Sequence, residues 1–290
     1  MTPVTGTLAV PGARLYHETR GAGPPLLLIA GGNSDAAVFT GLADALADRY
    51  RVLSYDARGY SRSPLDGPPC DQFIETHAED AHRLLTHLAP SGGPVRVFGS
   101  CSGGLVAMAL AARYPEAVGP LVVHEPPAML LLPDAAEHLA LFDEVHALSV
   151  REGIPAAMRR LSVIFGGRPA PVLPEERDNT AFFLAHVVRP FARHRPDLGA
   201  LARTRRRVAV AGGHTSRGQT VHRPAVVLAQ RLGRDLALFP GGHVGYAKHP
   251  AAFADRLAEV LSGLEDGRPS SAESPGTVGT DPVRDGAASA

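Results

Sequence analysis

The sequence predicts an α/β fold in which helices cover both faces of a mostly parallel, doubly wound β-sheet. Apolar segments of strand length alternate along the chain with segments whose apolar residues recur at helical spacing. Most of the strand segments are apolar without interruption, which is typical of parallel strands buried on both faces. At 290 residues, of which 44% are hydrophobic, the chain is long enough to bury a substantial core.

The first half of the chain alternates strands and helices in a regular order. "TLAVPG" and "ARLYHETRG" predict a hairpin. The strands predicted after it are "PPLLLIAGG", "YRVLSYDARG" and "PVRVFG", and the helices are "VFTGLADALADRY", "FIETHAEDAHRLLTHLAP" and residues 102–114. This is a repeated strand-helix-strand rhythm, which places neighbouring strands parallel to one another.

The second half keeps this rhythm except in one long segment. Further strands are predicted in "AVGPLVVHEPP", in residues 206–213 and in residues 234–242, but residues 127–205 contain successive helical periods without a strand. We therefore expect residues 1–126 and 206–264 to form the core and residues 127–205 to form a helical cap. Residues 265–290 are rich in Gly, Pro, Ser and acidic residues, so we expect a disordered tail there.

Composition excludes several classes of function. The chain has 29 acidic and 29 basic residues, so it lacks the net positive charge that gathers nucleic acid or an anionic membrane. It has no apolar run near the roughly 20 residues that span a bilayer and no basic leader, so we expect a cytoplasmic protein. Metal-ligand spacings, P-loops and dinucleotide glycine patterns are absent, so we expect neither a metal nor another cofactor. The expected partner is a small-molecule substrate, and the sequence gives no oligomeric state.

One short segment, "VRVFGSCSGG", carries the strongest chemical signal. A side chain that projects from a tight turn between a strand and a helix requires very small residues two positions before and after it. Gly99 and Gly103 stand at those positions around Cys101. Ser102, flanked by Ser100 and Gly104, is the alternative centre. A structural interpretation also exists, since an unpaired cysteine is often a small buried apolar residue.

With this segment and three others, the chain resembles the α/β-hydrolase fold superfamily over about residues 13–262. "GSCSG" resembles the nucleophile elbow, "LLLIAGG" the segment that supplies an oxyanion amide, "DARGYSRSP" the turn after the next strand, and "FPGGHVGYAKHP" the segment with the catalytic histidine. Most members place Ser at the elbow, whereas epoxide hydrolases and haloalkane dehalogenases place Asp. The resemblance implies that Cys101 is the nucleophile, as in the dienelactone hydrolases, and disfavours epoxide opening.

The resemblance also implies the other members of the site. The general base is His243, in a loop of small residues after the last predicted strand, with His214 as an alternative. The expected oxyanion donors are the backbone N–H groups of Ser102 and Gly32, with Asn33 as an alternative to Gly32.

The acid departs from the usual pattern of the superfamily. The loop that commonly carries it is "GGHTSRGQ", which has no carboxylate, but some members place the acid one strand earlier, where this chain has "VVHEPP". Glu125 is therefore the candidate that orients the histidine. Two alternatives stay open: Glu125 helps to hold the first turn of the cap, or the site works without an acid.

These residues predict a hydrolase or acyl transferase. The predicted reaction splits an ester, lactone or thioester of a small organic molecule through an acyl-enzyme on cysteine. The alternative is a protein of the same fold without a complete triad, which binds a small molecule or acts as a biosynthetic cyclase.

Overall fold

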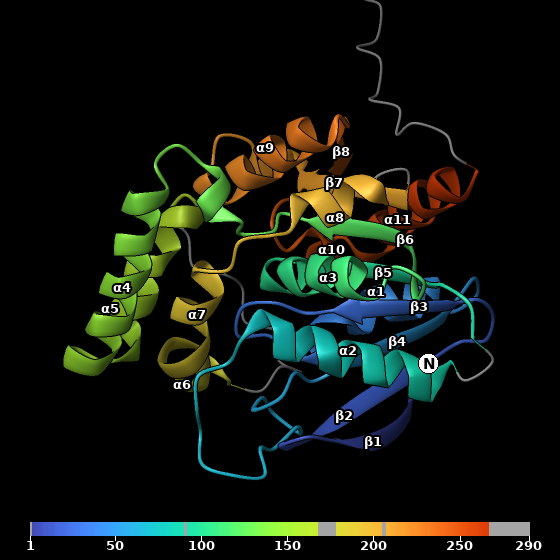
Figure 1. The fold of residues 1–290 in the computed structure, drawn as a ribbon, viewed down its shortest axis with the longest axis horizontal. Coiled ribbons are helices and arrows are strands. Elements are labelled where there is room, and N and C mark those ends of the chain that lie inside the picture. The colour runs from blue at the N-terminus through green and yellow to red at the C-terminus, as the bar shows by residue number, and fades with distance from the viewer. Residues whose placement is uncertain (1, 90–91, 168–177, 205–206, 267–290) are drawn as a thin grey trace, which may run out of the picture.

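A computed structural model describes residues 2–89, 92–167, 178–204 and 207–266 (Figure 1). These residues contain an eight-stranded sheet with the strand order β1-β2-β4-β3-β5-β6-β7-β8. From β4 to β8 all neighbouring strands are parallel, whereas β1 and β2 form the predicted antiparallel hairpin at one edge. The predicted mostly parallel sheet is confirmed. The strands are β1 (Val4–Val10), β2 (Ala13–Arg20), β3 (Pro25–Ile29), β4 (Arg51–Tyr55), β5 (Val95–Ser100), β6 (Val118–His124), β7 (Val208–Gly213) and β8 (Leu236–Phe239).

Helices cover both faces of this sheet because its strands present apolar side chains to both sides. Successive side chains of a strand point to opposite faces. In β3, Leu27 and Ile29 belong to one apolar cluster and Leu26 and Leu28 to the other. The first cluster packs against α2 (Ile74–Leu88), α3 (Ser102–Arg113) and α9 (Arg223–Leu232). The second packs against α1 (Thr40–Leu46), α10 (Gly245–Lys248) and α11 (Pro250–Glu265).

A helical segment separates β6 from β7, as the sequence predicts. We call its elements the inserted helices, and α4 and α5 lie side by side at one end of the molecule (Figure 1). They are η2 (Met129–Leu131), α4 (Ala135–Arg151), α5 (Ile154–Leu161), η3 (Ser162–Phe165), α6 (Thr180–Phe182), η4 (Phe183–Val187), which is a π-helix, and α7 (Val188–Ala192). A further helix, α8 (Leu198–Arg203), precedes β7 and contacts α3.

The remaining short elements are 3-10 turns in the loops that follow strands. They are η1 (Ala36–Phe39), η6 (His214–Ser216) and η7 (Thr220–His222). Helix α11 continues to Glu265, and the remainder of the predicted tail, except Asp266, lies outside the described residues.

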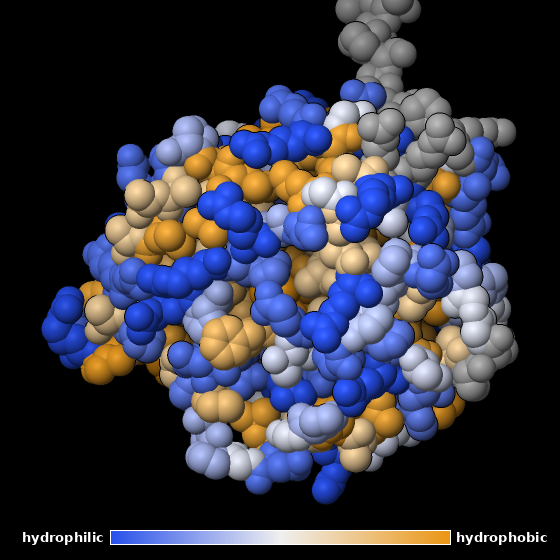
Figure 2. All heavy atoms as spheres, viewed as in Figure 1, coloured by the Kyte–Doolittle hydropathy of each residue, from blue (hydrophilic) through white to orange (hydrophobic). Residues whose placement is uncertain are grey.

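The surface is mixed in character. On the face shown in Figure 2, hydrophilic side chains are distributed over the molecule with smaller hydrophobic areas between them. Among the helices of the described residues, none combines the length and the apolar character required to cross a bilayer.

Candidate active site

Cys101 stands at a strained turn between β5 and α3. Its backbone has φ 54° and ψ −132°, a region that residues other than glycine rarely adopt. The two glycines around it are required by close packing. A Cβ at Gly99 would collide with the carbonyl oxygen of Gly103, and a Cβ at Gly103 would collide with that of Ile29. The turn therefore presents the Cys101 side chain above the end of the sheet, as the spacing of the glycines predicts.

His243 and Glu125 meet next to this cysteine, from two separate loops. His243 follows β8, and its Nδ1 lies 2.8 Å from Oε2 of Glu125, the residue after β6. Cys101 and His243 line the same pocket, and the Cys101 side chain is among the groups that shift the pKa of His243. Glu125 is fully buried, and its φ of 45° is again left-handed. The structure thus brings together Cys101, His243 and Glu125, three residues spread over nearly half of the chain.

The charges of this group favour a protonated histidine and an ionised carboxylate. Burial alone would lower the pKa of His243, but interactions with Cys101 and the hydrogen bond to Glu125 outweigh it and raise the pKa to about 10. Burial alone would raise the pKa of Glu125, but hydrogen bonds from His222 and His243 hold it well below its usual range. The arrangement supports an imidazolium that the carboxylate of Glu125 stabilises.

The carboxylate of Glu125 has further partners that the sequence did not indicate. Its Oε1 accepts hydrogen bonds from the backbone N–H of Gly213 at 2.9 Å, from Nδ1 of His222 at 2.9 Å and from the hydroxyl of Ser216. These donors belong to the loop after β7, which carries no carboxylate. His222 was missed because it is one of 13 histidines and its neighbours give no local motif.

The predicted oxyanion donors lie next to Cys101, and one of them is already engaged. The N–H of Gly32 donates to Oγ of Ser102 at 2.8 Å. Asn33, the alternative to Gly32, points its side-chain amide at Thr180 of α6, at 2.9 Å, and its carbonyl accepts from Asn179. The N–H of Ser102 lies at the start of α3, where a helix leaves its first amides without partners.

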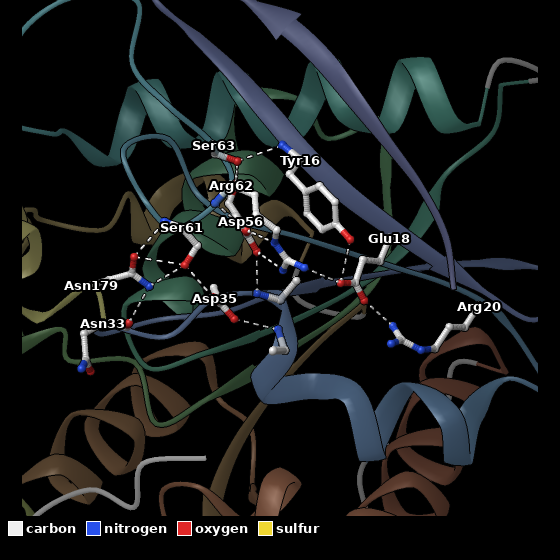
Figure 3. Close-up of polar contacts among 12 residues, drawn as sticks. Tyr16, Glu18, Arg20, Asn33, Asp35, Asp56, Ser61, Arg62, Ser63 and Asn179 are labelled. Atoms are coloured by element: carbon white, nitrogen blue, oxygen red, sulfur yellow. Dashed lines mark hydrogen bonds and ion pairs between the residues drawn. The ribbon is translucent and has the colours of Figure 1, made fainter. Parts of the chain in front are cut away.

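A polar network holds the loop after β3, which contains Gly32 (Figure 3). Asp56, which is fully buried after β4, accepts from the N–H of Ala36 at 3.0 Å and pairs through both oxygens with Arg62, at 2.7 and 2.8 Å. Arg62 also reaches Glu18 at 3.0 Å. The segment "DARGYSRSP" is therefore the anchor of the loop after β3, since its carboxylate bonds directly to that loop.

Asn179 connects this network to the inserted helices. Its Oδ1 accepts from the N–H of Ser61 at 2.8 Å, and its Nδ2 donates to the carbonyl of Asn33 at 3.1 Å (Figure 3). Ser61 in turn donates to Asp35 at 2.6 Å. The start of α6 is thus fastened to the loop that carries Gly32.

A pocket that is partly open to solvent lies over Cys101. Cys101, Ser102, Gly32, Asn33 and His243 are among the residues that line it. The inserted helices add an apolar part of the lining with Phe142, Met158, Leu161, Ile164, Phe165, Phe183, Val188, Phe191 and Ala192. The pocket is therefore polar beside His243 and apolar along the inserted helices.

Two other predictions concern histidine and metal. His214, the alternative base, is exposed at the start of η6, and among the described residues it does not line the pocket. Within the same residues no group of three or more His, Cys, Asp or Glu side chains is arranged to hold a metal ion.

Comparisons with known proteins place this geometry in context. A family model described as "alpha/beta hydrolase fold" matches residues 24–150. The chain is 34% identical over 266 residues to the uncharacterized hydrolase YraK of Bacillus subtilis (strain 168), covering 90% of this chain and 97% of that protein. It is 26% identical to the zearalenone hydrolase of Bionectria ochroleuca, with 88% and 96% covered. A thermophilic esterase from Thermogutta terrifontis has a similar fold, with a TM-score of 0.65, 21% identity and 91% and 99% of the two chains covered.

Proposed function

The chain belongs to the alpha/beta hydrolase fold family, and from that premise we propose that it hydrolyses an ester, lactone or thioester of a small apolar molecule through a cysteine acyl-enzyme. One observation carries the proposal. Cys101 stands at a strained turn with φ 54° and lines one pocket together with His243, whose Nδ1 lies 2.8 Å from Oε2 of Glu125. Nucleophile, base and orienting acid are the three parts that acyl transfer requires.

The reaction proceeds in two steps. The Cys101 thiolate attacks the carbonyl carbon, a C–S bond forms, and the carbonyl electrons move to oxygen. When that oxyanion collapses, the bond to the leaving oxygen or sulfur breaks, and the proton on His243 passes to the leaving group. Water then attacks the thioester while His243 takes its proton, the C–S bond breaks, and the acid leaves with the thiolate restored. With a lactone the leaving group stays attached, so the product is a hydroxy acid.

Backbone amides stabilise the oxyanion in this proposal. The donors are the N–H groups of Ser102 and Gly32, and removing one such donor in a serine enzyme costs about 10²–10³ in rate. The N–H of Gly32 donates to Ser102 Oγ, so this hydroxyl has to turn away before that amide reaches an oxyanion.

The inserted helices act as the cap of the site in this proposal. Their apolar side chains form part of the lining of the pocket, and Phe165 of η3 lies against the ring of His243 with centroids 4.9 Å apart. These contacts support a substrate without charge. Zearalenone belongs in the first substrate panel, because a relative that is similar over most of both chains is a zearalenone hydrolase.

Intact-protein mass spectrometry tests the proposal. The parent protein is mixed for seconds with aryl esters, thioesters, lactones and zearalenone, and is then quenched in acid. We expect a mass increase equal to the acyl part for at least one compound, located on the peptide that contains Cys101. Cys70→Ser, which removes the exposed second cysteine, is the matched control and should give the same adduct. His243→Ala should slow adduct formation by at least about 10²-fold. Turnover of a compound by Cys101→Ala at the parent rate would overturn the proposal.

A further inference from the structure

The loop after β7 contains a histidine that faces the carboxylate of the site. Relatives of the resembled superfamily commonly carry the acid in this loop, whereas here residues 213–222 contain no carboxylate. Instead the loop supplies three donors, Gly213, Ser216 and His222, which all bond to Oε1 of Glu125. Oε2 is thereby left to His243, at 2.8 Å.

We propose that His222 is a positioning residue, whose Nδ1–H holds Oε1 of Glu125 so that Oε2 stays directed at His243. The proposal rests on the proposed function, because it assigns His222 to the same triad. His222 touches neither Cys101 nor the pocket over it among the described residues, so it acts only through Glu125.

The backbone around Glu125 explains why the carboxylate has to be held. With φ of 45°, Glu125 adopts a strained backbone conformation that residues other than glycine rarely adopt. A carboxylate with one oxygen unbound would be free to rotate away from His243. Three donors on Oε1 remove that freedom, and the hydrogen bond from His222 is almost fully buried.

The strand next to His222 is shaped around its ring. A Cβ on Gly212 would lie 2.5 Å from Cε1 and 2.8 Å from Nδ1 of His222. Gly212 does not have a positive φ, so its backbone does not require glycine. The space is needed by the imidazole, and this is a second observation, independent of the hydrogen bond, that the fold accommodates His222 at this point.

The titratable groups that face Glu125 are His222, His243 and His124. Burial lowers the pKa of His124 to about 4, so its ring is neutral near pH 7. His243 faces Glu125 and Cys101. Loss of the hydrogen bond from His222 therefore leaves the carboxylate of Glu125 less firmly directed at His243. The His243 cation is then stabilised less, and the thiolate of Cys101 loses part of the stabilisation that this cation provides.

Alkylation of Cys101 by iodoacetamide as a function of pH tests this chain of effects. It is measured between pH 4 and 10 in a Cys70→Ser background, where a single thiol reacts. In His222→Leu we expect the pH of half-maximal alkylation to rise by about one unit, and acylation by the best ester to slow about tenfold. His222→Asn places an amide nitrogen at the position of Nδ1, so its curve should stay within about 0.3 units of the parent curve.

Gly212→Ala keeps every donor but displaces the ring, and we expect its curve to shift in the same direction as that of His222→Leu. An unchanged midpoint in His222→Leu, or equal shifts in His222→Leu and His222→Asn, would overturn the role of His222. If His222→Leu does not fold, Gly212→Ala and His222→Asn decide in the same way. Alkylation needs no acyl substrate, so a failure of the proposed function appears separately, as a parent protein that alkylates normally but forms no acyl adduct.

Discussion

A thiol at the turn after β5 changes what its neighbours have to do. A hydroxyl needs a base for every attack, whereas a thiolate beside an imidazolium is already a nucleophile. In the proposed mechanism the residues around Cys101 stabilise such a charge pair. The pKa of His243 is raised to about 10, because Cys101 and Glu125 together outweigh the effect of its burial.

The first prediction concerns the two adjacent side chains of the turn. Cys101→Ala should abolish acyl transfer. Ser102→Ala keeps the backbone N–H of residue 102 and removes the hydroxyl that accepts the hydrogen bond from the N–H of Gly32. Its kcat/KM should therefore stay within about threefold of the parent value or exceed it. Steady-state kinetics with one aryl ester compare the two variants. If Ser102→Ala loses as much activity as Cys101→Ala, Ser102 is the nucleophile.

The second prediction is the replacement of Glu125 by Gln. The amide oxygen of Gln has to face the donors Gly213 and His222, so its NH₂ group faces Nδ1 of His243. This favours the tautomer that carries its proton on Nε2, toward Cys101, which is the wrong one for a base. We expect turnover to slow about tenfold, far less than the roughly 10⁴-fold seen when the acid of a serine triad is changed. Unchanged turnover with an unchanged pH profile would make Glu125 structural.

Single residues were predictable from the sequence where a local spacing marks them. Gly99 and Gly103 mark Cys101, and the small residues around His243 mark that loop. Glu125 was predicted only through the resemblance, because the usual loop contains no carboxylate and some members of the superfamily place the acid one strand earlier. His222, Ser216 and Asn179 could not be found in this way, because their partners lie more than 90 residues away and nothing in their own segments indicates a contact.

At the scale of elements, the turn between β5 and α3 sits against the loop after β3. The third prediction follows from this packing. In Gly103→Ala the new methyl group meets the carbonyls of Ile29 and Ala30, so we expect a loss of about 1–3 kcal/mol in the free energy of unfolding. Gly263→Ala in α11 is the control, because nothing lies within 4 Å of its Cβ, and we expect it to stabilise the protein by up to about 1 kcal/mol. Urea unfolding measures both, and equal effects would contradict the close approach.

The junction between α6 and the loop after β3 gives the fourth prediction. Asn179→Ala leaves the N–H of Ser61 and the carbonyl of Asn33 without this partner, which typically costs about 1–3 kcal/mol. Because Asn33 follows Gly32, the loss should also raise KM for the best ester by severalfold. Thermal unfolding and steady-state kinetics measure the two effects. A variant with parent stability and parent KM would show that α6 is held by other contacts.

Elements were predicted well because each has a strong pattern of its own. The strands of the sheet and helices α2 and α3 follow continuous apolar runs or helical spacing. Between β6 and β7 the sequence indicated helices but not their breaks. The π-helix Phe183–Val187 and the short α6 and α7 depend on packing against the core, which no local pattern encodes.

For the whole molecule, buried histidines connect stability to pH, and this is the fifth prediction. Burial lowers the pKa of His77 to about 3, with a contribution from Arg58, and that of His124 to about 4. Both rings are neutral in the folded protein but take up a proton near pH 6.5 when it unfolds. The contribution of these two histidines to the free energy of unfolding is therefore fully present above pH 6.5. It falls as the pH decreases toward 4, by up to about 1.4 kcal/mol per pH unit for each histidine.

Urea unfolding between pH 5 and 6.5 measures this dependence. His77→Leu removes one of these groups, so its free energy of unfolding should depend on pH less steeply than that of the parent in this range. His243 acts mainly above this range, because its raised pKa places its loss of stabilisation between pH 6.5 and about 10. If the free energy of unfolding depends on pH equally steeply in His77→Leu and in the parent, the His77 ring does not cause the pH dependence.

The contact between Phe165 and His243 has a consequence for the proposed acyl-enzyme. The phenyl ring lies against the imidazole with centroids 4.9 Å apart, and both residues line the pocket. In the proposed mechanism the retained acyl chain would occupy this pocket, so water would have to enter through the same space. A long acyl chain would then delay its own release, whereas a short one would leave a path for water. Two isomeric esters, one with a bulky acyl part and one with a bulky alcohol part, would thus differ in the lifetime of the intermediate. The small acyl group left by the ester with the bulky alcohol would be released sooner.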